Sequence, residues 1–105
     1  MGKKYQKRAA DLIQLHLTDL LQTQVNDPRV EMVTITGVEV TPDTRRADVY
    51  FTVLGGPEAR DEALAGLESA AGFLRRELGR RIRLRNTPEI VFHWDESFER
   101  GERIS

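Results

Sequence analysis

Cysteine is absent from this 105-residue sequence, which excludes disulfide bonds, thiolate metal sites and a cysteine nucleophile. The lack of cysteine also fits a reducing compartment, and we expect a cytoplasmic protein. No apolar run approaches the roughly 20 residues that a membrane helix needs. The basic start of the chain is not followed by the apolar stretch of a signal peptide. We therefore expect no membrane contact and a fold held together by its core alone.

Aromatic residues are also scarce, at 7% of the chain with one tryptophan. Most of them fall at spacings expected of core positions, and an aromatic residue at core spacing is usually buried. A base-stacking surface of the kind found in many RNA-binding modules is therefore only weakly indicated. The aromatic residues placed where they can stack on bases are Tyr5, Tyr50 and Phe98.

The net charge of -1 hides an uneven distribution of charged residues. Basic residues gather in residues 1–8 and 75–85, whereas acidic residues gather in 58–68 and 89–102. Such a chain is expected to present one basic and one acidic face, and placement matters more for nucleic-acid binding than the sum. The clustered basic residues are Lys3, Lys4, Lys7, Arg8, Arg75, Arg76, Arg80, Arg81, Arg83 and Arg85.

The length suits one domain with one core, and we assign residues 1–105 to it, with 96–105 as an irregular tail or a frayed helical turn. From about residue 4 to residue 25, apolar side chains recur at steps of three and four, which predicts an amphipathic helix. Asp27-Pro28 ends it, because the residue before a proline is pushed out of helical geometry. Leu12 and Leu15 lie at the edge of the apolar stripe or outside it. One of them is therefore expected to be exposed or to contact a partner.

Alternating apolar residues predict strands in the rest of the chain. Val33 and Ile35 alternate in one phase and Val38 and Val40 in the other, so the buried face must change parity near Gly37. We expect a β-bulge there, since glycine adopts the left-handed backbone that one type of bulge requires. The remaining signals are a turn at 41–44 and alternating strands at 47–53 and 90–94.

A second helix is predicted from Pro57, which suits the first helical position, to Gly79. Gly72 interrupts it, and a glycine inside a helix costs about 1 kcal/mol relative to alanine. A kink between two helices is the simplest reason for its presence. The predicted order is helix, strand, strand, kinked helix, strand, which gives an α+β domain whose three-stranded sheet carries all helices on one face. The opposite face is expected to stay open and to include Thr34, Tyr50 and His93.

The arginines near the end of the second helix are the feature with the most chemical content. Clustered arginines offer bidentate contacts to phosphates, so RNA is the expected ligand. The other explanation is that arginine is a good helix former on a solvated face, partly neutralised by Glu77 and neighbouring acids. The pattern by itself leaves both explanations open.

Catalysis is considered because Asp95, Glu96 and Glu99 follow the last strand, with His93 beside them. Acid–base or metal chemistry needs such groups to converge, whereas neighbouring strand residues point to opposite faces. His16 belongs to the first helix and is expected to be a packed histidine. We therefore expect no enzyme, no metal site and no cofactor.

Five segments in collinear order over nearly the whole chain carry a more specific pattern. They are Val25-Asn26-Asp27-Pro28-Arg29, VTITGVEVTPD at 33–43, Ala47-Asp48-Val49-Tyr50, SAAGFLRRELG at 69–79 and LRNTPEI at 84–90. These segments resemble the ribosome-binding factor A family. Several independent segments agree, which is far more specific than one short motif.

The resemblance implies a type II KH fold in which an Ala-x-Gly kink, here Ala70-Ala71-Gly72, replaces the Gly-x-x-Gly loop that clamps about four nucleotides in an ordinary KH domain. It also implies a protein that binds the small ribosomal subunit, assists late maturation and processing of its rRNA, and supports growth in the cold. Release is linked in the family to other assembly factors, including a GTPase. We expect a monomer whose clustered basic residues contact rRNA over the kink.

Two other functions stay open at this point. The domain could bind an assembly partner through the open sheet face or through Leu12 and Leu15, with little direct RNA contact. A metal-dependent hydrolase using Asp95 and Glu99 is the third hypothesis. It predicts an activity that is lost on chelation.

Overall fold

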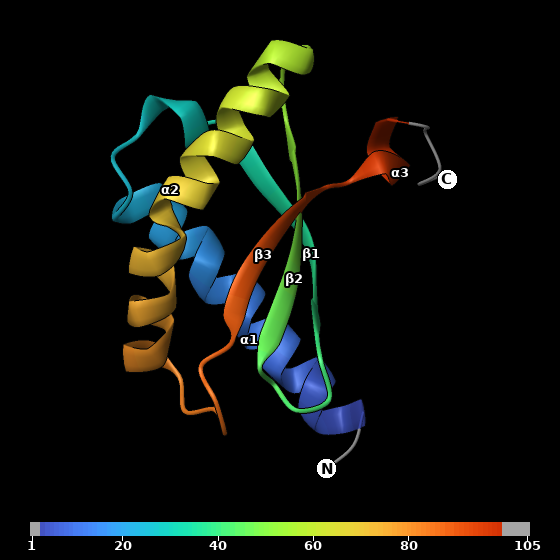
Figure 1. The fold of residues 1–105 in the computed structure, drawn as a ribbon, viewed down its shortest axis with the longest axis vertical. Coiled ribbons are helices and arrows are strands. Elements are labelled where there is room, and N and C mark those ends of the chain that lie inside the picture. The colour runs from blue at the N-terminus through green and yellow to red at the C-terminus, as the bar shows by residue number, and fades with distance from the viewer. Residues whose placement is uncertain (1–2, 100–105) are drawn as a thin grey trace.

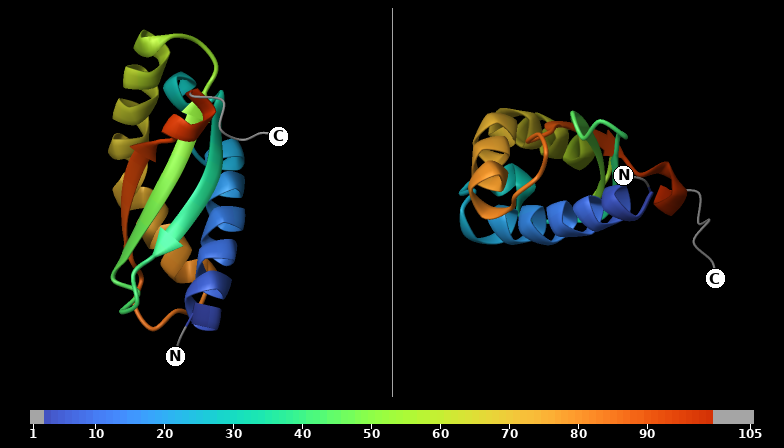
Figure 2. Two further views of the ribbon diagram at one scale, coloured as in Figure 1. Left: turned by 90° about the vertical axis from the view of Figure 1, so that its right-hand side faces the viewer. Right: turned by 90° about the horizontal axis from the view of Figure 1, so that it is seen from below.

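Two long helices and a three-stranded sheet form two layers in the computed structural model of the chain (Figure 1). It describes the backbone of residues 3–99 and the side chains of residues 3–97. Figure 2 (left) shows the sheet in front of both helices, so the face of the sheet that is turned to the viewer is not covered by them. Within the described residues, no helix has both the length and the apolar character needed to cross a bilayer. The elements are α1 (Lys3–Thr23), the 3-10 helix η1 (Pro28–Val30), β1 (Val33–Val40), β2 (Arg46–Val53), α2 (Pro57–Arg81), β3 (Glu89–Trp94) and α3 (Glu96–Glu99).

The predicted α+β class is confirmed, and β2 is the central strand, antiparallel to β1 and parallel to β3. Parallel pairing needs a crossover, which α2 supplies. In β1, Ile35 pairs with Phe51 and Gly37 pairs with Tyr50, so Thr36 is the extra residue of a β-bulge. The bulge confirms the predicted change of parity. Its expected cause was wrong, because Gly37 does not have a positive φ.

The core lies between the inner sheet face and facing stripes of α1 and α2. Val49 and Phe51 of the central strand are fully buried, and burying a large apolar side chain contributes on the order of 1.5–3 kcal/mol. Outside the α1 stripe, Leu15 is 64% exposed and Leu12 is half-buried. The buried helical residues are Ala9, Ile13, Leu17, Leu20 and Leu21 of α1, and Ala63, Gly66, Leu67, Leu74 and Leu78 of α2.

Helix α1 also covers the outer edge of β1. Gln6 Nε2 donates to the carbonyl of Val40 at 2.8 Å, and Gln14 Nε2 donates to the carbonyl of Ile35 at 3.1 Å. Edge strands otherwise present such carbonyls to solvent or to another chain. The two glutamines therefore hold α1 along β1 and place its first turns near the end of that strand.

Helix α2 is continuous over its whole length, so the predicted kink bends the helix without dividing it into two. Figure 1 shows its axis changing direction about midway, where the ribbon passes from yellow to gold. Gly72 faces open space, since the nearest atom to a Cβ placed there is Arg76 Nη1 at 3.8 Å. The predicted end at Gly79 was early. A Cβ at that position would lie 3.1 Å from the hydroxyl oxygen of Thr87, so this glycine allows the α2–β3 connection to pack closely.

Gly66 is the glycine of α2 that packing requires most. A Cβ there would lie 2.8 Å from Cγ1 of Val30 and 3.2 Å from Cβ of Arg29. Both residues belong to η1, which the sequence did not predict. Asp27 caps η1 by accepting a hydrogen bond from the main-chain N–H of Arg29 at 3.0 Å. The Asp-Pro-Arg segment thus packs directly on the backbone of α2.

Candidate nucleic-acid interface

Three segments that are distant in sequence meet at one end of the molecule, at the bottom of Figure 1. They are the first turns of α1, the β1–β2 turn (41–45) and the α2–β3 connection (82–88). The main-chain N–H of Arg85 donates to the Tyr5 hydroxyl at 3.0 Å, and Asn86 Nδ2 donates to the carbonyl of Asp43 at 2.9 Å. These bonds join the connection to α1 and to the turn. We call this region the cationic end, defined by its exposed basic residues Lys3, Lys4, Lys7, Arg8, Arg45, Arg83 and Arg85.

The basic residues at the start of α1 are exposed, and most of them have no ion-pair partner within the described residues. Lys7 lies 3.8 Å from Asp11, while Lys3, Lys4 and Arg8 form no ion pair within the residues that the structure describes. The first turn of α1 holds no acidic residue. Positive side chains at a helix N-terminus repel the positive end of the helix dipole. Their placement therefore costs the fold some stability and favours binding of an external anion.

Arg81, a predicted RNA-binding residue, is committed to the fold instead. Its Nη1 donates to Asp19 Oδ2 at 2.7 Å and lies 3.4 Å from Nδ1 of His16. Only 26% of the Arg81 side chain is exposed. The guanidinium links the end of α2 to α1, so we do not count Arg81 in the interface.

The other three arginines of α2 that were predicted to bind RNA are exposed but differ in their contacts. Arg75 donates to the carbonyl of Thr87 at 3.0 and 3.3 Å, which steadies the α2–β3 connection. Arg80 lies 3.5 Å from Glu77 in an exposed pair, which solvent screens strongly. Arg76 has no carboxylate partner among residues 3–97. Arg76 and Arg80 are thus the α2 residues most available to phosphate.

The predicted kink motif lies just before these arginines. Ala70 and Ala71 are half-buried and pack against the core, whereas Gly72 is exposed. With no side chain, Gly72 leaves open space beside Arg76. The helix continues through the motif without a break.

Arg45 is the basic residue at this end that the sequence analysis missed. It lies on the β1–β2 turn, 3.8 Å from Asp43. Arg83 and Arg85 extend from the α2–β3 connection and have no ion pair within the described residues. No spacing in the sequence indicates that residue 45 joins residues 3–8 and 83–85, because their proximity arises only when the chain folds.

Acidic side chains gather towards the other end of α2, at the top of Figure 1. Glu58 lies in the first turn of α2, and Asp61 and Glu62 are exposed in the next. Acids at a helix N-terminus and arginines at its C-terminus both stabilise the helix dipole. The net charge is small because acidic residues near the start of α2 offset the basic residues near its end.

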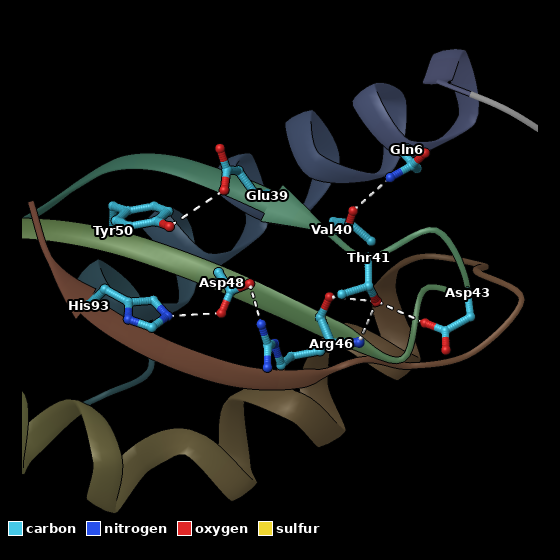
Figure 3. A network of polar contacts seen from close by, with 9 residues as sticks. All are labelled: Gln6, Glu39, Val40, Thr41, Asp43, Arg46, Asp48, Tyr50 and His93. Atoms are coloured by element: carbon cyan, nitrogen blue, oxygen red, sulfur yellow. Dashed lines mark hydrogen bonds and ion pairs between the residues drawn. The ribbon is translucent and has the colours of Figure 1, made fainter.

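The open sheet face carries a polar network (Figure 3). His93 Nε2 lies 2.8 Å from Asp48 Oδ1, and Arg46 donates to Asp48 Oδ2 at 3.2 Å. Burial pushes the pKa of Asp48 up, but the hydrogen bonds from His93 and Arg46 outweigh it and hold that pKa below its ordinary value. Tyr50 stacks on His93 with ring centroids 5.2 Å apart and donates to Glu39 at 3.4 Å. Burial and the nearby carboxylates raise the pKa of Tyr50.

Asp95, the first acid after β3, is bound by side chains other than His93. Thr36 and Ser97 both donate to Asp95, at 2.5 and 2.6 Å, while His93 faces Asp48. Within the described residues, no three side chains of metal-ligating type come together. The segment predicted to be irregular or a frayed helical turn contains α3, and the side chain of Glu99 and residues 100–105 lie outside the description.

Fold and charge together define a small α+β domain that presents exposed basic side chains from three segments at one end. A family model described as ribosome-binding factor A matches residues 5–105. The ribosome-binding factor A of Aromatoleum aromaticum is 48% identical to this chain, over 100% of it and 84% of the relative. The chain belongs to the ribosome-binding factor A family, a family named for ribosome binding and not for an enzymatic activity.

Two solved structures share the fold. The solution NMR structure of a candidate ribosome-binding factor A from Thermotoga maritima has a TM-score of 0.75 at 40% identity, covering 89% of this chain and 90% of that one. A homology model of the Thermus thermophilus ribosome-binding factor A, fitted into the electron cryo-microscopy map of its complex with the 30S subunit, has a TM-score of 0.59 at 26% identity. It covers 81% of this chain and 93% of that one.

Proposed function

We propose that this chain is a single KH-like RNA-binding domain that binds the free small ribosomal subunit through its rRNA. Family membership supports the proposal, as does the 30S complex of the Thermus thermophilus relative. The observation that carries it is the group of exposed basic side chains at the cationic end, five of which form no ion pair within the described residues. Such cations bind phosphates by releasing condensed counterions, whatever the base sequence.

The proposed interface is the cationic end together with Arg75, Arg76 and Arg80 of α2. The open space at Gly72 lies beside Arg76, so an rRNA backbone can approach that part of α2 closely. Without a Gly-x-x-Gly loop, recognition relies on the shape and phosphate spacing of folded rRNA. Arg81 contributes indirectly, by holding α2 against α1.

The biological role proposed is the one that the family resemblance implies. The protein assists late maturation and processing of small-subunit rRNA, supports growth in the cold, and leaves before translation begins. An assembly GTPase is the proposed partner in release. The protein acts as a cytoplasmic monomer.

A sucrose gradient of a cell extract tests this function. We expect the tagged chain to comigrate with free small subunits and to be absent from translating ribosomes. Charge reversal at two exposed arginines, Arg76→Glu with Arg83→Glu, should move the chain to the top of the gradient. Equal distribution over subunits and translating ribosomes contradicts the assembly role.

The alternative is a protein-interaction domain that docks an assembly partner with little RNA contact. The 64% exposure of Leu15 favours it, since a large apolar side chain on a helix surface suits a protein contact. The open sheet face is the other surface for this role. Binding to naked small-subunit rRNA fragments separates the two functions: RNA binding that survives Leu15→Lys but not the double arginine reversal supports the first.

A further inference from the structure

Three consecutive residues of the α2–β3 connection are each tied to a different element. The main-chain N–H of Arg85 donates to the Tyr5 hydroxyl of α1 at 3.0 Å. Asn86 Nδ2 donates to a carbonyl of the β1–β2 turn at 2.9 Å, and the carbonyl of Thr87 accepts from Arg75 of α2 at 3.0 Å. A segment held at three successive residues loses little further freedom when it binds a ligand.

The Arg85 side chain lies over an aromatic ring and not against an acid. Its Cζ is 5.3 Å from the centroid of the Tyr5 ring, which is a cation–π distance. The side chain is exposed and forms no ion pair with a carboxylate in the described part of the chain. The guanidinium therefore lies against Tyr5 on an exposed residue, and no carboxylate among the described residues pairs with it.

The surroundings of this pair are cationic. Arg8 lies three residues after Tyr5 and so shares its face of α1, and Lys4 and Arg83 are exposed close by in sequence. A phosphate bound by these side chains holds its nucleotide at the end of the molecule where α1 meets the α2–β3 connection and Arg85 lies. Proteins recognise unpaired RNA bases by stacking them on aromatic rings or on arginine guanidinium planes.

We propose that Arg85, supported by Tyr5, is a stacking platform for an unpaired RNA base beside the phosphates that the cationic end binds. This inference rests on the proposed RNA binding and adds its ligand class: a single-stranded nucleotide, in addition to phosphate backbone. Lysine carries the same charge as arginine without the planar group. One substitution can therefore separate stacking from charge.

The test compares Arg85→Lys with Arg60→Lys, a matched control outside the proposed interface, where Cζ of Arg60 lies 5.7 Å from the centroid of the Trp94 ring. The Tyr5 hydroxyl accepts from the main chain of residue 85, so Arg85→Lys keeps that hydrogen bond. The probes are an oligoadenylate with 2-aminopurine at alternate positions, whose fluorescence falls when a base stacks on the protein, and an RNA duplex of equal length. Affinity is measured over a series of salt concentrations.

Arg85→Lys should bind the single strand roughly tenfold more weakly, in line with the loss of one base-stacking contact. Quenching should fall, while the salt slope stays unchanged because no charge is lost. Duplex binding by Arg85→Lys, and binding of both probes by Arg60→Lys, should stay within about twofold of the wild type. Equal effects of the two substitutions, or an equal loss on the duplex, overturn the stacking role.

Two substitutions of Tyr5 check the support beneath Arg85. Tyr5→Phe keeps the ring and should retain most of the quenching, whereas Tyr5→Leu should lose as much as Arg85→Lys; urea midpoints show whether each variant is folded. Should Tyr5→Leu unfold, the comparison of the two lysine variants decides. A wild type that binds neither these probes nor a naked small-subunit rRNA fragment defeats the proposed function itself. A wild type that binds the fragment but not the single strand, or that binds both probes with Arg85→Lys behaving like Arg60→Lys, defeats the stacking role alone.

Discussion

Arg81 and Asp19 are 62 residues apart in sequence, yet Nη1 of Arg81 lies 2.7 Å from Oδ2 of Asp19. Half of the Asp19 side chain is exposed, so solvent screens the pair. We expect Arg81→Ala to lower the free energy of unfolding by about 0.5–1 kcal/mol. A double-mutant cycle with Asp19→Asn, followed by urea unfolding, measures the coupling. Zero coupling, with RNA affinity lost as strongly as in Arg83→Ala, contradicts the structural role of Arg81.

The two glycines in the middle of α2 should respond in opposite directions to alanine. Gly66→Ala places a Cβ 2.8 Å from Cγ1 of Val30, and such overpacking costs about 1–3 kcal/mol. Gly72→Ala meets open space and should raise the free energy of unfolding by about 0.5–1 kcal/mol. Thermal unfolding of both variants checks the order. A destabilised Gly72→Ala beside a stable Gly66→Ala contradicts the packing described here.

Gly66 and Gly72 also show how much of the fold was predictable from the sequence. The α1 stripe, the strands and the parity change in β1 were predictable, because a buried face imposes a period of 3.6 or 2 on the residues that form it. A glycine in a helix was recognised as costly, but its purpose depends on what lies beside it. The sequence pointed to Gly72, whereas the close approach of η1 makes Gly66 the residue that packing requires.

The interface was predictable only in part for the same reason. The basic clusters of α1 and α2 stand out in the composition, and the family resemblance added a role for them. Contacts between distant segments decide which of these cations are free. Arg81 forms an ion pair with Asp19. Arg45 belongs to a turn that is hydrogen-bonded to the α2–β3 connection, and no periodicity in the sequence indicates that contact.

Charge reversal at the start of α1 should lower the affinity for RNA and raise the stability of the fold. Lys3→Glu with Lys4→Glu replaces positive charge at the positive end of the helix dipole, which typically stabilises a helix by about 0.3–1 kcal/mol per charge. The same change removes two cations from the proposed interface. Urea unfolding and rRNA-fragment binding on one preparation measure both quantities. Loss of stability together with unchanged binding would show that these lysines serve the fold.

Asp48 should contribute to stability at neutral pH and lose that contribution in acid. The fold lowers its pKa below the ordinary 3.8, so its contribution is complete well above that value and disappears as the pH falls through the lower, folded value. Asp48→Asn should therefore flatten the acid limb of a plot of urea midpoint against pH. Asp61→Asn is the control, because it removes an exposed acid outside the network. An acid limb that Asp48→Asn leaves unchanged argues against the His93 and Arg46 contacts.

The most direct test of the interface is the salt dependence of binding to a naked small-subunit rRNA fragment. Arg76→Glu with Arg83→Glu should weaken binding and reduce the slope of log affinity against log salt by between one and two units, since each phosphate contact adds about 0.7–0.9. The control, Gln22→Glu with Gln24→Glu, adds negative charge at the far end of α1 and should leave the slope unchanged. An affinity and slope that stay at wild-type values in the double arginine variant would contradict the cationic end and the neighbouring arginines of α2 as the rRNA-binding surface.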